Sequence, residues 1–174
     1  TFPYKRLIKV IKTRPDGLFS SGYLKQNILD EDMDRLKTFY ANEGFLDAKA
    51  SYALEQAPQS KLIVNVQVSE GKRYYLGSLT VAGNGKVLST EEIMKAMTRL
   101  KVDGVFTPEK LEKDISDINS LYFDKGYIFA NAKESTSINA ETGKVDVRLD
   151  ITEGELAYVN KVKVEGNNRT RDIV

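Results

Sequence analysis

The chain has 174 residues, of which 41% are hydrophobic and 29% are charged, so it can bury modest cores as one ordinary domain or two small ones. Its 26 basic and 25 acidic side chains leave a net charge of +1, which supplies no field for binding nucleic acid. It contains no Cys and no His, which excludes disulfides and thiolate catalysis and removes the commonest general base and zinc ligand. We therefore expect no enzyme, no metal and no cofactor.

The first part of the chain predicts two helices followed by two strands. The first helix is expected over residues 4–13 and the first strand over residues 46–54. The second helix would present a stripe of apolar residues at spacings of four, three and four, and the second strand would alternate apolar with polar residues. The helix stripe is Leu29, Met33, Leu36 and Tyr40, and the apolar strand positions are Leu62, Val64, Val66 and Val68.

Three aspartates in the second helix, Asp30, Asp32 and Asp34, resemble the opening of a calcium-binding loop. Such a loop needs Gly at its sixth position and Glu at its twelfth, where this chain has Arg35 and Ala41. We therefore interpret the three carboxylates as the polar face of a helix.

The next segment predicts a strand and a short helix. Residues 74–81 are rich in aromatic and β-branched residues, with Tyr75, Leu79 and Val81 expected on one face. Gly83 to Gly85 form a turn. Ser89 and Glu92 have the spacing of a capping box for a helix that ends before Asp103 and Gly104. The apolar face of this helix is expected to contain Ile93, Met94 and Met97.

A longer helix and a hairpin follow. Thr107 is a favourable N-cap, Pro108 suits the first helical position, and Gly126 is expected to end the helix. Strands are predicted over residues 127–138 and 145–151, joined by a loop at 139–143. The apolar stripe of the helix is Leu111, Ile115, Ile118 and Tyr122, and the last strand alternates Val145, Val147, Leu149 and Ile151 with charged residues.

The two parts repeat each other. Tyr40, Gly44, Phe45, Ala48 and Ala50 match Tyr122, Gly126, Tyr127, Ala130 and Ala132 at an offset of 82. Glu70, Gly71, Tyr75 and Gly83 match Glu153, Gly154, Tyr158 and Gly166 at an offset of 83. The period is too long for a solenoid repeat, so each copy is expected to be a small domain.

The repeat predicts three pieces. Residues 1–72 form a unit without its first strand, residues 73–155 form a complete unit, and residues 156–174 contain the first strand of another, expected at 158–164 with a turn at Gly166. The complete unit has the order strand, helix, helix, strand, strand. This order predicts an α+β fold in which two helices pack on a three-stranded mixed sheet.

Such a unit of about 80 residues, repeated in tandem, resembles the POTRA (polypeptide-transport-associated) domain. The resemblance rests on the phrases L-K-T-F-Y-A-N-E-G-F-L-D-A and I-N-S-L-Y-F-D-K-G-Y-I-F-A, the junctions V-S-E-G-K-R-Y-Y-L-G and I-T-E-G-E-L-A-Y-V-N, and the turns V-A-G-N and V-E-G-N-N-R-T. In this respect the chain resembles the third and fourth modules, plus the start of the fifth, of BamA-like outer-membrane protein assembly factors.

The resemblance implies an arm on the periplasmic side of the bacterial outer membrane. Its expected partners are unfolded outer-membrane proteins, accessory outer-membrane lipoproteins and the membrane barrel at the C-terminus of the parent protein. The alternative is the POTRA region of a two-partner secretion transporter or of a cell-division protein. An enzyme that uses carboxylates is the remaining alternative, and it would need several acids gathered in one concave site.

In POTRA modules the second strand is commonly the exposed edge, where a partner can add a strand through backbone hydrogen bonds. The expected edge residues are Ala48, Lys49, Ala50, Ser51 and Tyr52 in the first unit and Ala130, Asn131, Ala132, Lys133 and Glu134 in the second. The expected interdomain hinge contains Glu70, Gly71, Tyr75, Glu153, Gly154 and Tyr158. Glu70 and Glu153 would either be solvated at a strand end or anchor the angle between units.

The missing first strand has a further consequence. The first unit is expected to expose a sheet edge, and residues 158–164 are a chemically similar replacement. We therefore expect self-association by strand exchange between copies.

Overall fold

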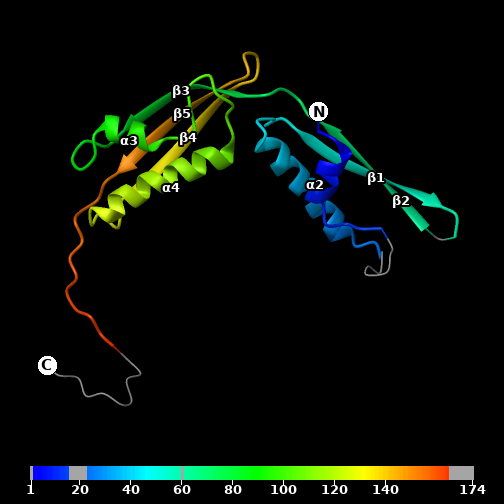
Figure 1. The fold of residues 1–174 in the computed structure, drawn as a ribbon, viewed down its shortest axis with the longest axis horizontal. Helices are drawn as coiled ribbons and strands as arrows, with labels where there is room; N and C mark the ends of the chain where they lie inside the picture. Colours follow the sequence, from blue (N-terminus) through cyan, green and yellow to red (C-terminus); the bar gives the residue numbers. More distant parts are fainter. Residues whose placement is uncertain (1, 16–22, 60, 165–174) are drawn as a thin grey trace.

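The protein folds into two units, each with helices beside a small sheet (Figure 1). The structure is a computed structural model and describes residues 2–15, 23–59 and 61–164. The first unit contains α1 (Tyr4–Val10), α2 (Gln26–Ala41), β1 (Lys49–Ala57) and β2 (Lys61–Ser69). The second contains β3 (Tyr75–Ala82), α3 (Thr90–Ala96), α4 (Pro108–Asp124), β4 (Asn131–Asn139) and β5 (Lys144–Thr152).

The second unit has the predicted order of elements. Its sheet runs β3-β5-β4, with β3 parallel and β4 antiparallel to the central strand β5. Helices α3 and α4 lie on the same side of this sheet (Figure 1). The predicted α+β class with a three-stranded mixed sheet is therefore confirmed.

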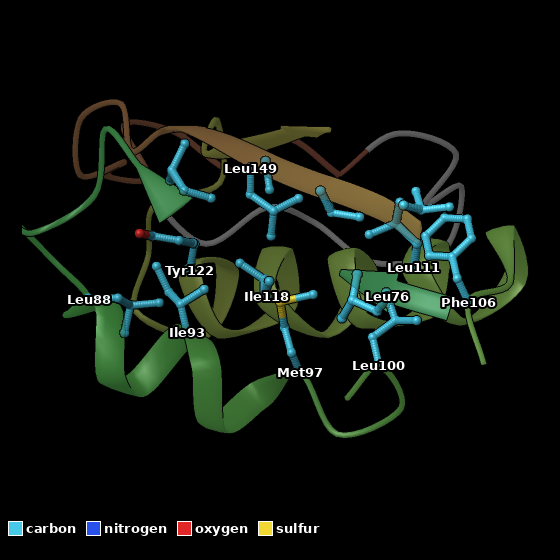
Figure 2. Close-up of a cluster of buried hydrophobic side chains, with 14 of the residues drawn as sticks. Leu76, Leu88, Ile93, Met97, Leu100, Phe106, Leu111, Ile118, Tyr122 and Leu149 are labelled. Atoms are coloured by element: carbon cyan, nitrogen blue, oxygen red, sulfur yellow. The ribbon is translucent and has the colours of Figure 1, made fainter. Parts of the chain in front are cut away.

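The core of this unit fills the space between the sheet and the two helices. Tyr122, Ile93 and Leu88 lie at one end of it, and Phe106 and Leu100 lie at the other (Figure 2). Alternate residues of β5 point into the core and the charged residues between them are exposed, as predicted. The buried β5 residues are Val145, Val147, Leu149 and Ile151.

The helix starts in the second unit are capped as predicted. The Ser89 hydroxyl accepts a hydrogen bond from the Glu92 N–H, and the Glu92 carboxylate accepts one from the Ser89 N–H. Thr107 accepts from the Lys110 N–H. The expectation for Met94 is wrong, because its side chain is exposed while Ile93 is buried. Met94 lies about 100° further round the helix than Ile93, which turns it away from the sheet.

A bulge in β3 changes which of its residues face the core. The register with β5 shifts between Leu76 and Ser78, so Leu76 faces inward together with Leu79 and Val81. Tyr75 was expected on this face but is 37% exposed. One extra residue in a strand reverses the alternation on one side of the bulge, which explains this error.

Both helix-to-strand connections are longer than the sequence predicted. β4 begins at Asn131 and β1 at Lys49, rather than at residues 127 and 46. Before β4, the Tyr127 N–H donates to the Tyr122 carbonyl and the Ala130 N–H donates to the Tyr127 carbonyl. These turn hydrogen bonds use backbone groups that a strand would present to a neighbour.

The first unit leaves part of β2 uncovered. Leu62 is 49% exposed and Val66 is also exposed. The alternation of apolar and polar residues predicted a buried face for this strand, and that prediction is wrong at these two positions. Their equivalents Val145 and Leu149 are buried because β5 lies between two strands. Within the described residues β2 pairs only with β1.

Residues 158–164 do not form the predicted strand. They have no regular secondary structure and run away from the second unit (Figure 1). Isolated strands leave their backbone groups unpaired, and no strand pairs with this segment in the part of the chain that the structure describes. All of its residues are exposed, including the large apolar ones Tyr158, Val159, Val162 and Val164. The turn predicted at Gly166 lies outside the described residues.

The interpretation of Asp32 as part of a solvated helix face is wrong. Asp32 is buried in α2, and its carboxylate accepts hydrogen bonds from the N–H groups of Lys12 and Thr13 at 2.6 and 2.8 Å. Asp114, one repeat later in α4, accepts from the N–H groups of Arg99 and Leu100. Each carboxylate thus satisfies the backbone that follows the first helix of its unit, which also explains why α1 ends at Val10 rather than at residue 13.

The Asp114 interaction gives a test of fold stability. Asp114→Ala would leave the half-buried N–H of Arg99 and the buried N–H of Leu100 without this acceptor, and we expect it to lower the free energy of unfolding of the second unit by about 2–4 kcal/mol. Asp117→Ala is the control, because Asp117 binds the same Arg99 at the surface and exposed pairs contribute below about 1 kcal/mol. Urea unfolding followed by NMR signals of the second unit would measure both. Equal effects would contradict this role of Asp114.

Candidate functional site

The connection between the two units is held by hydrogen bonds to the turn after α2. The Tyr74 N–H donates to the Gly44 carbonyl at 2.8 Å, and the Arg73 Nε donates to the Glu43 carbonyl at 3.1 Å. The Tyr74 hydroxyl donates to the Asp47 carboxylate. The start of the second unit is therefore fixed to the first by both backbone and side-chain contacts.

The turn depends on the absence of a side chain at Gly44. Its φ is +95°, in the region that favours glycine, and a Cβ placed there would lie 2.5 Å from Cγ1 of Val105 in the second unit. Gly126 has a φ of +86° at the equivalent place. The sequence correctly placed both glycines at the reversal from helix to strand, but it did not reveal their carbonyls as acceptors for the next unit.

The Glu153 side chain, at the end of β5, joins three segments of the second unit. Its carboxylate accepts hydrogen bonds from the Tyr122 hydroxyl at 2.9 Å and from the N–H of Lys86 at 2.9 Å. It also accepts from the N–H groups of Gly85, Val87 and Leu88. Because Glu153 is buried and has these donors, its interpretation as a solvated strand end is wrong.

These contacts shift the pKa values of both side chains. Burial opposes ionisation of Glu153, but the Tyr122 hydroxyl and the N–H groups of the loop before α3 outweigh it, so the pKa of Glu153 lies below its ordinary value. Burial and the neighbouring carboxylate raise the pKa of Tyr122. The arrangement is repeated in the first unit, where the Tyr40 hydroxyl donates to Glu70 at 3.2 Å.

Residues 154–157 begin a second connection of the same kind. The Ala157 N–H donates to the Gly126 carbonyl at 3.0 Å, as Tyr74 does to Gly44. Gly154 has a φ of +70° and lies against Phe129, as Gly71, with a φ of +71°, lies against Asp47. The same backbone contacts therefore occur at the end of each unit, and we call these places the first and second junctions.

The other two expected hinge residues lie beside the junctions. The Tyr75 N–H donates to the Gly143 carbonyl, and its ring lies 5.9 Å from Nζ of Lys144. Tyr158 is exposed next to Ala157. Neither side chain contributes a hydrogen bond to the described junction contacts.

The structure places the expected edge residues of the second unit at the start of β4, which is an edge of the sheet. Ala130 precedes the strand, and the others lie in its first half. The Ala132 N–H donates to Oδ1 of Asn119 in α4 at 3.0 Å, so it points away from β5. Backbone groups alternate along an antiparallel strand, and Glu134, Thr136 and Ile138 therefore direct theirs to the open side as well.

Asn119 holds the start of β4 against α4, a role that was not predicted from the sequence. It satisfies the backbone of Ala132, whereas the equivalent position in the first unit is Lys37. The repeat that revealed the junctions therefore gave no signal here.

A shallow groove of about 450 Å³ lies beside the start of β4 and along α4. Apolar side chains from the helix and the turn line it together with polar ones, and two of the apolar residues, Phe123 and Ile128, are exposed. Its lining includes Ile115, Asn119, Phe123, Ile128 and Ala130.

The equivalent residues of the first unit lie at the start of β1, which also has one strand neighbour among the described residues. Ala48 precedes the strand and residues 49–52 begin it. The Tyr52 hydroxyl donates to Asp30 of α2 at 3.0 Å, which places this face of the strand toward the helix.

Within residues 2–15, 23–59 and 61–164, no group of three or more acidic side chains has the arrangement of a metal site. No helix in these ranges is long and apolar enough to span a bilayer.

Comparison with known proteins shows where this architecture recurs. The sequence model of the family described as "POTRA: Surface antigen variable number repeat" matches residues 1–71 and 74–154. The outer membrane protein assembly factor BamA of Nitratidesulfovibrio vulgaris is 31% identical over 91% of the chain, and that of Neisseria meningitidis serogroup B is 25% identical over 98%. The chain spans only 21% and 22% of the length of these two relatives.

A solved structure agrees with this match. The crystal structure of Haemophilus influenzae BamA POTRA3-5 superposes with a TM-score of 0.68 at 19% identity, covering 98% of this chain and 68% of the other. At this identity the likeness establishes the fold, which includes both units.

The lowered pKa of Glu153 makes a pH-dependent prediction. A carboxyl group whose pKa is lower in the folded state adds stability above its unfolded pKa, near 4.5, and this contribution is lost as the pH falls through the folded value. We expect Glu153→Gln to lower the melting temperature at pH 7, and the difference from the unmodified protein to shrink below about pH 4. Thermal unfolding at pH 3–7 measures it. Glu155→Gln, at an exposed neighbour, should show little difference at any pH, and a constant gap for Glu153→Gln would contradict the prediction.

Proposed function

The chain belongs to the POTRA family, and from this premise we propose that it forms part of the periplasmic arm of an outer-membrane β-barrel assembly factor. The observation that carries the proposal is the match of nearly the whole chain to BamA proteins, combined with two open sheet edges. The proposed modules are residues 1–72 and 73–155, with residues 156–174 beginning a third. Their proposed partners are unfolded outer-membrane proteins, accessory lipoproteins and the membrane barrel of the parent protein.

Binding would occur by addition of a partner strand to β4 and, in the same way, to β1. The open backbone groups of Glu134, Thr136 and Ile138 would pair with the incoming chain, since an edge strand is a template for another strand. Backbone pairing requires no particular sequence, which suits a protein that receives many different unfolded clients. The groove beside α4 would accept apolar side chains of the client and so favour one register.

The junctions would keep the modules in a restricted orientation. The hydrogen bonds from Arg73 and Tyr74 to the turn after α2 leave almost no free linker between the units. Interfaces between domains otherwise permit relative motion by default. We therefore propose a semi-rigid arm in which Glu70, Gly71, Glu153 and Gly154 set the direction of the chain.

Removal of one open N–H from β4 tests strand addition. Thr136→Pro should weaken binding about fivefold, because one backbone hydrogen bond contributes roughly 1 kcal/mol. The probe is a ten-residue peptide alternating Tyr or Val with Thr or Lys, and the readout is the change of amide NMR signals on titration. Ala132 is less suitable for this test, because its N–H already serves Asn119 within the fold.

Thr136→Val is the matched control, since it keeps the N–H and removes only the hydroxyl. Its affinity for the peptide should stay close to that of the unmodified protein. Equal affinity of the folded proline variant, or signal changes away from β1 and β4, would contradict binding by strand addition.

The sheet of the first unit has a further open edge, that of β2 on the side opposite β1. We propose that residues 158–164 of one copy pair in parallel with β2 of another, as β3 pairs with β5. The pattern fits, because Val159, Val162 and Val164 occupy the positions of the inward-facing β3 residues one repeat earlier. Those residues are Leu76, Leu79 and Val81.

Engineered disulfides test this register in a chain that has no Cys of its own. Ser78 and Asp146, whose side chains are joined by a 2.6 Å hydrogen bond, correspond to Lys161 and Ile63. Lys161→Cys in one copy and Ile63→Cys in another should therefore form a crosslinked dimer in an oxidising buffer, visible on a non-reducing gel. Lys161→Cys with Gln67→Cys is the out-of-register control. Equal crosslinking of both pairs, or a strict monomer by sedimentation at high concentration, would contradict the proposal.

A further inference from the structure

The two junctions differ at one pair of positions although their backbone contacts are the same. At the first junction, Tyr74 is buried in the core of the second unit, and its hydroxyl donates to Asp47 on the turn of the first. One repeat later these positions hold Ala157 and Phe129. Both members of the hydrogen-bonded pair have thus been exchanged, the large residue for a small one and the small residue for a large one.

The backbone at the second junction already has the geometry needed for a docked unit. The Ala157 N–H is bonded to the Gly126 carbonyl, and Gly154 lies against Phe129 as Gly71 lies against Asp47. The Phe129 side chain is nevertheless 73% exposed. The exposed Phe129 residue therefore lies directly beside the docked segment 154–157.

We propose that Phe129 is the anchor for the next POTRA module of the parent protein. Its ring would enter the core of that module at the place that the Tyr74 ring occupies in the second unit, where Ala157 leaves space. The first junction would then be closed by a hydrogen bond between Tyr and Asp, and the second by burial of an aromatic ring. This inference rests on the proposed arrangement of tandem modules, but not on strand addition to β4.

Phe129 would contact a following module rather than an unfolded client, because the residue that leaves space for its ring, Ala157, belongs to this chain. Position 157 is continuous with the docked segment 154–157, and it corresponds to the first core residue of the second unit. The large and small residues are exchanged together, which keeps the volume at the junction roughly constant. A constant volume is what close packing between two folded units requires.

The test uses the parent protein carried through one complete module after Gly154. Phe129→Ala should lower the melting temperature of that module by at least about 4 °C, and NMR relaxation should show it tumbling independently of the second unit. The control is Phe123→Ala, because Phe123 is 63% exposed but its equivalent, Ala41, takes no part in the first junction. In the 174-residue chain Phe129→Ala should leave the melting temperature unchanged.

A charge and size exchange gives a second, independent measurement. Phe129→Asp alone should uncouple the following module, and adding Ala157→Tyr should restore coupling, because the double variant recreates the Tyr and Asp pair of the first junction. Coupling that survives both Phe129→Ala and Phe129→Asp would overturn the anchor, as would a double variant no better than Phe129→Asp. Absence of peptide binding at β4 would instead contradict strand addition and leave this anchor standing, whereas coupling that survives the Phe129 variants leaves strand addition standing, so the two proposals fail separately.

Discussion

The arrangement of the chain depends on the hydrogen bonds that the Glu153 carboxylate accepts. A buried carboxylate must be satisfied by hydrogen bonds, and here the donors come from α4 and from the loop between β3 and α3. The end of β5 is thereby fixed to both sides of the core, so the chain leaves the unit at a defined point. Gly154 then turns it with a positive φ, and Ala157 reaches the Gly126 carbonyl. These successive contacts determine the direction of the following segment.

Each unit also uses a buried aspartate to hold its two helices together. Asp32 and Asp114 lie on the second helix and accept from N–H groups of the connection after the first, which would otherwise lack an acceptor. Such small units bury little apolar surface for their size. Polar groups that bind several backbone donors therefore specify where the short first helix ends, and the apolar stripe of the longer helix supplies the core.

The sequence and its repeat were enough to predict the order of elements, the helix caps, and the positions of Gly44 and Gly126 where a helix reverses into a strand. The repeat could also have identified Asp32 and Asp114, which match at the same offset of 82 as Tyr40 and Tyr122, had buried polar residues been compared as well as apolar ones. The face of Tyr75 was beyond such reasoning, because a bulge of one residue leaves no clear pattern in a short strand. Asn119 has no counterpart in the first unit, so only the three-dimensional contact with Ala132 reveals it.

Rigid junctions and open sheet edges are compatible because they use different backbone groups. The start of β4 is fixed by Asn119 and by the turn that follows α4. The other end of β4 meets the hairpin near the first junction, where Nζ of Lys72 donates to the Ala140 carbonyl. The open groups of Glu134, Thr136 and Ile138 lie between these two fixed points. A partner strand could therefore add to the middle of β4 without breaking any of the contacts at the junctions.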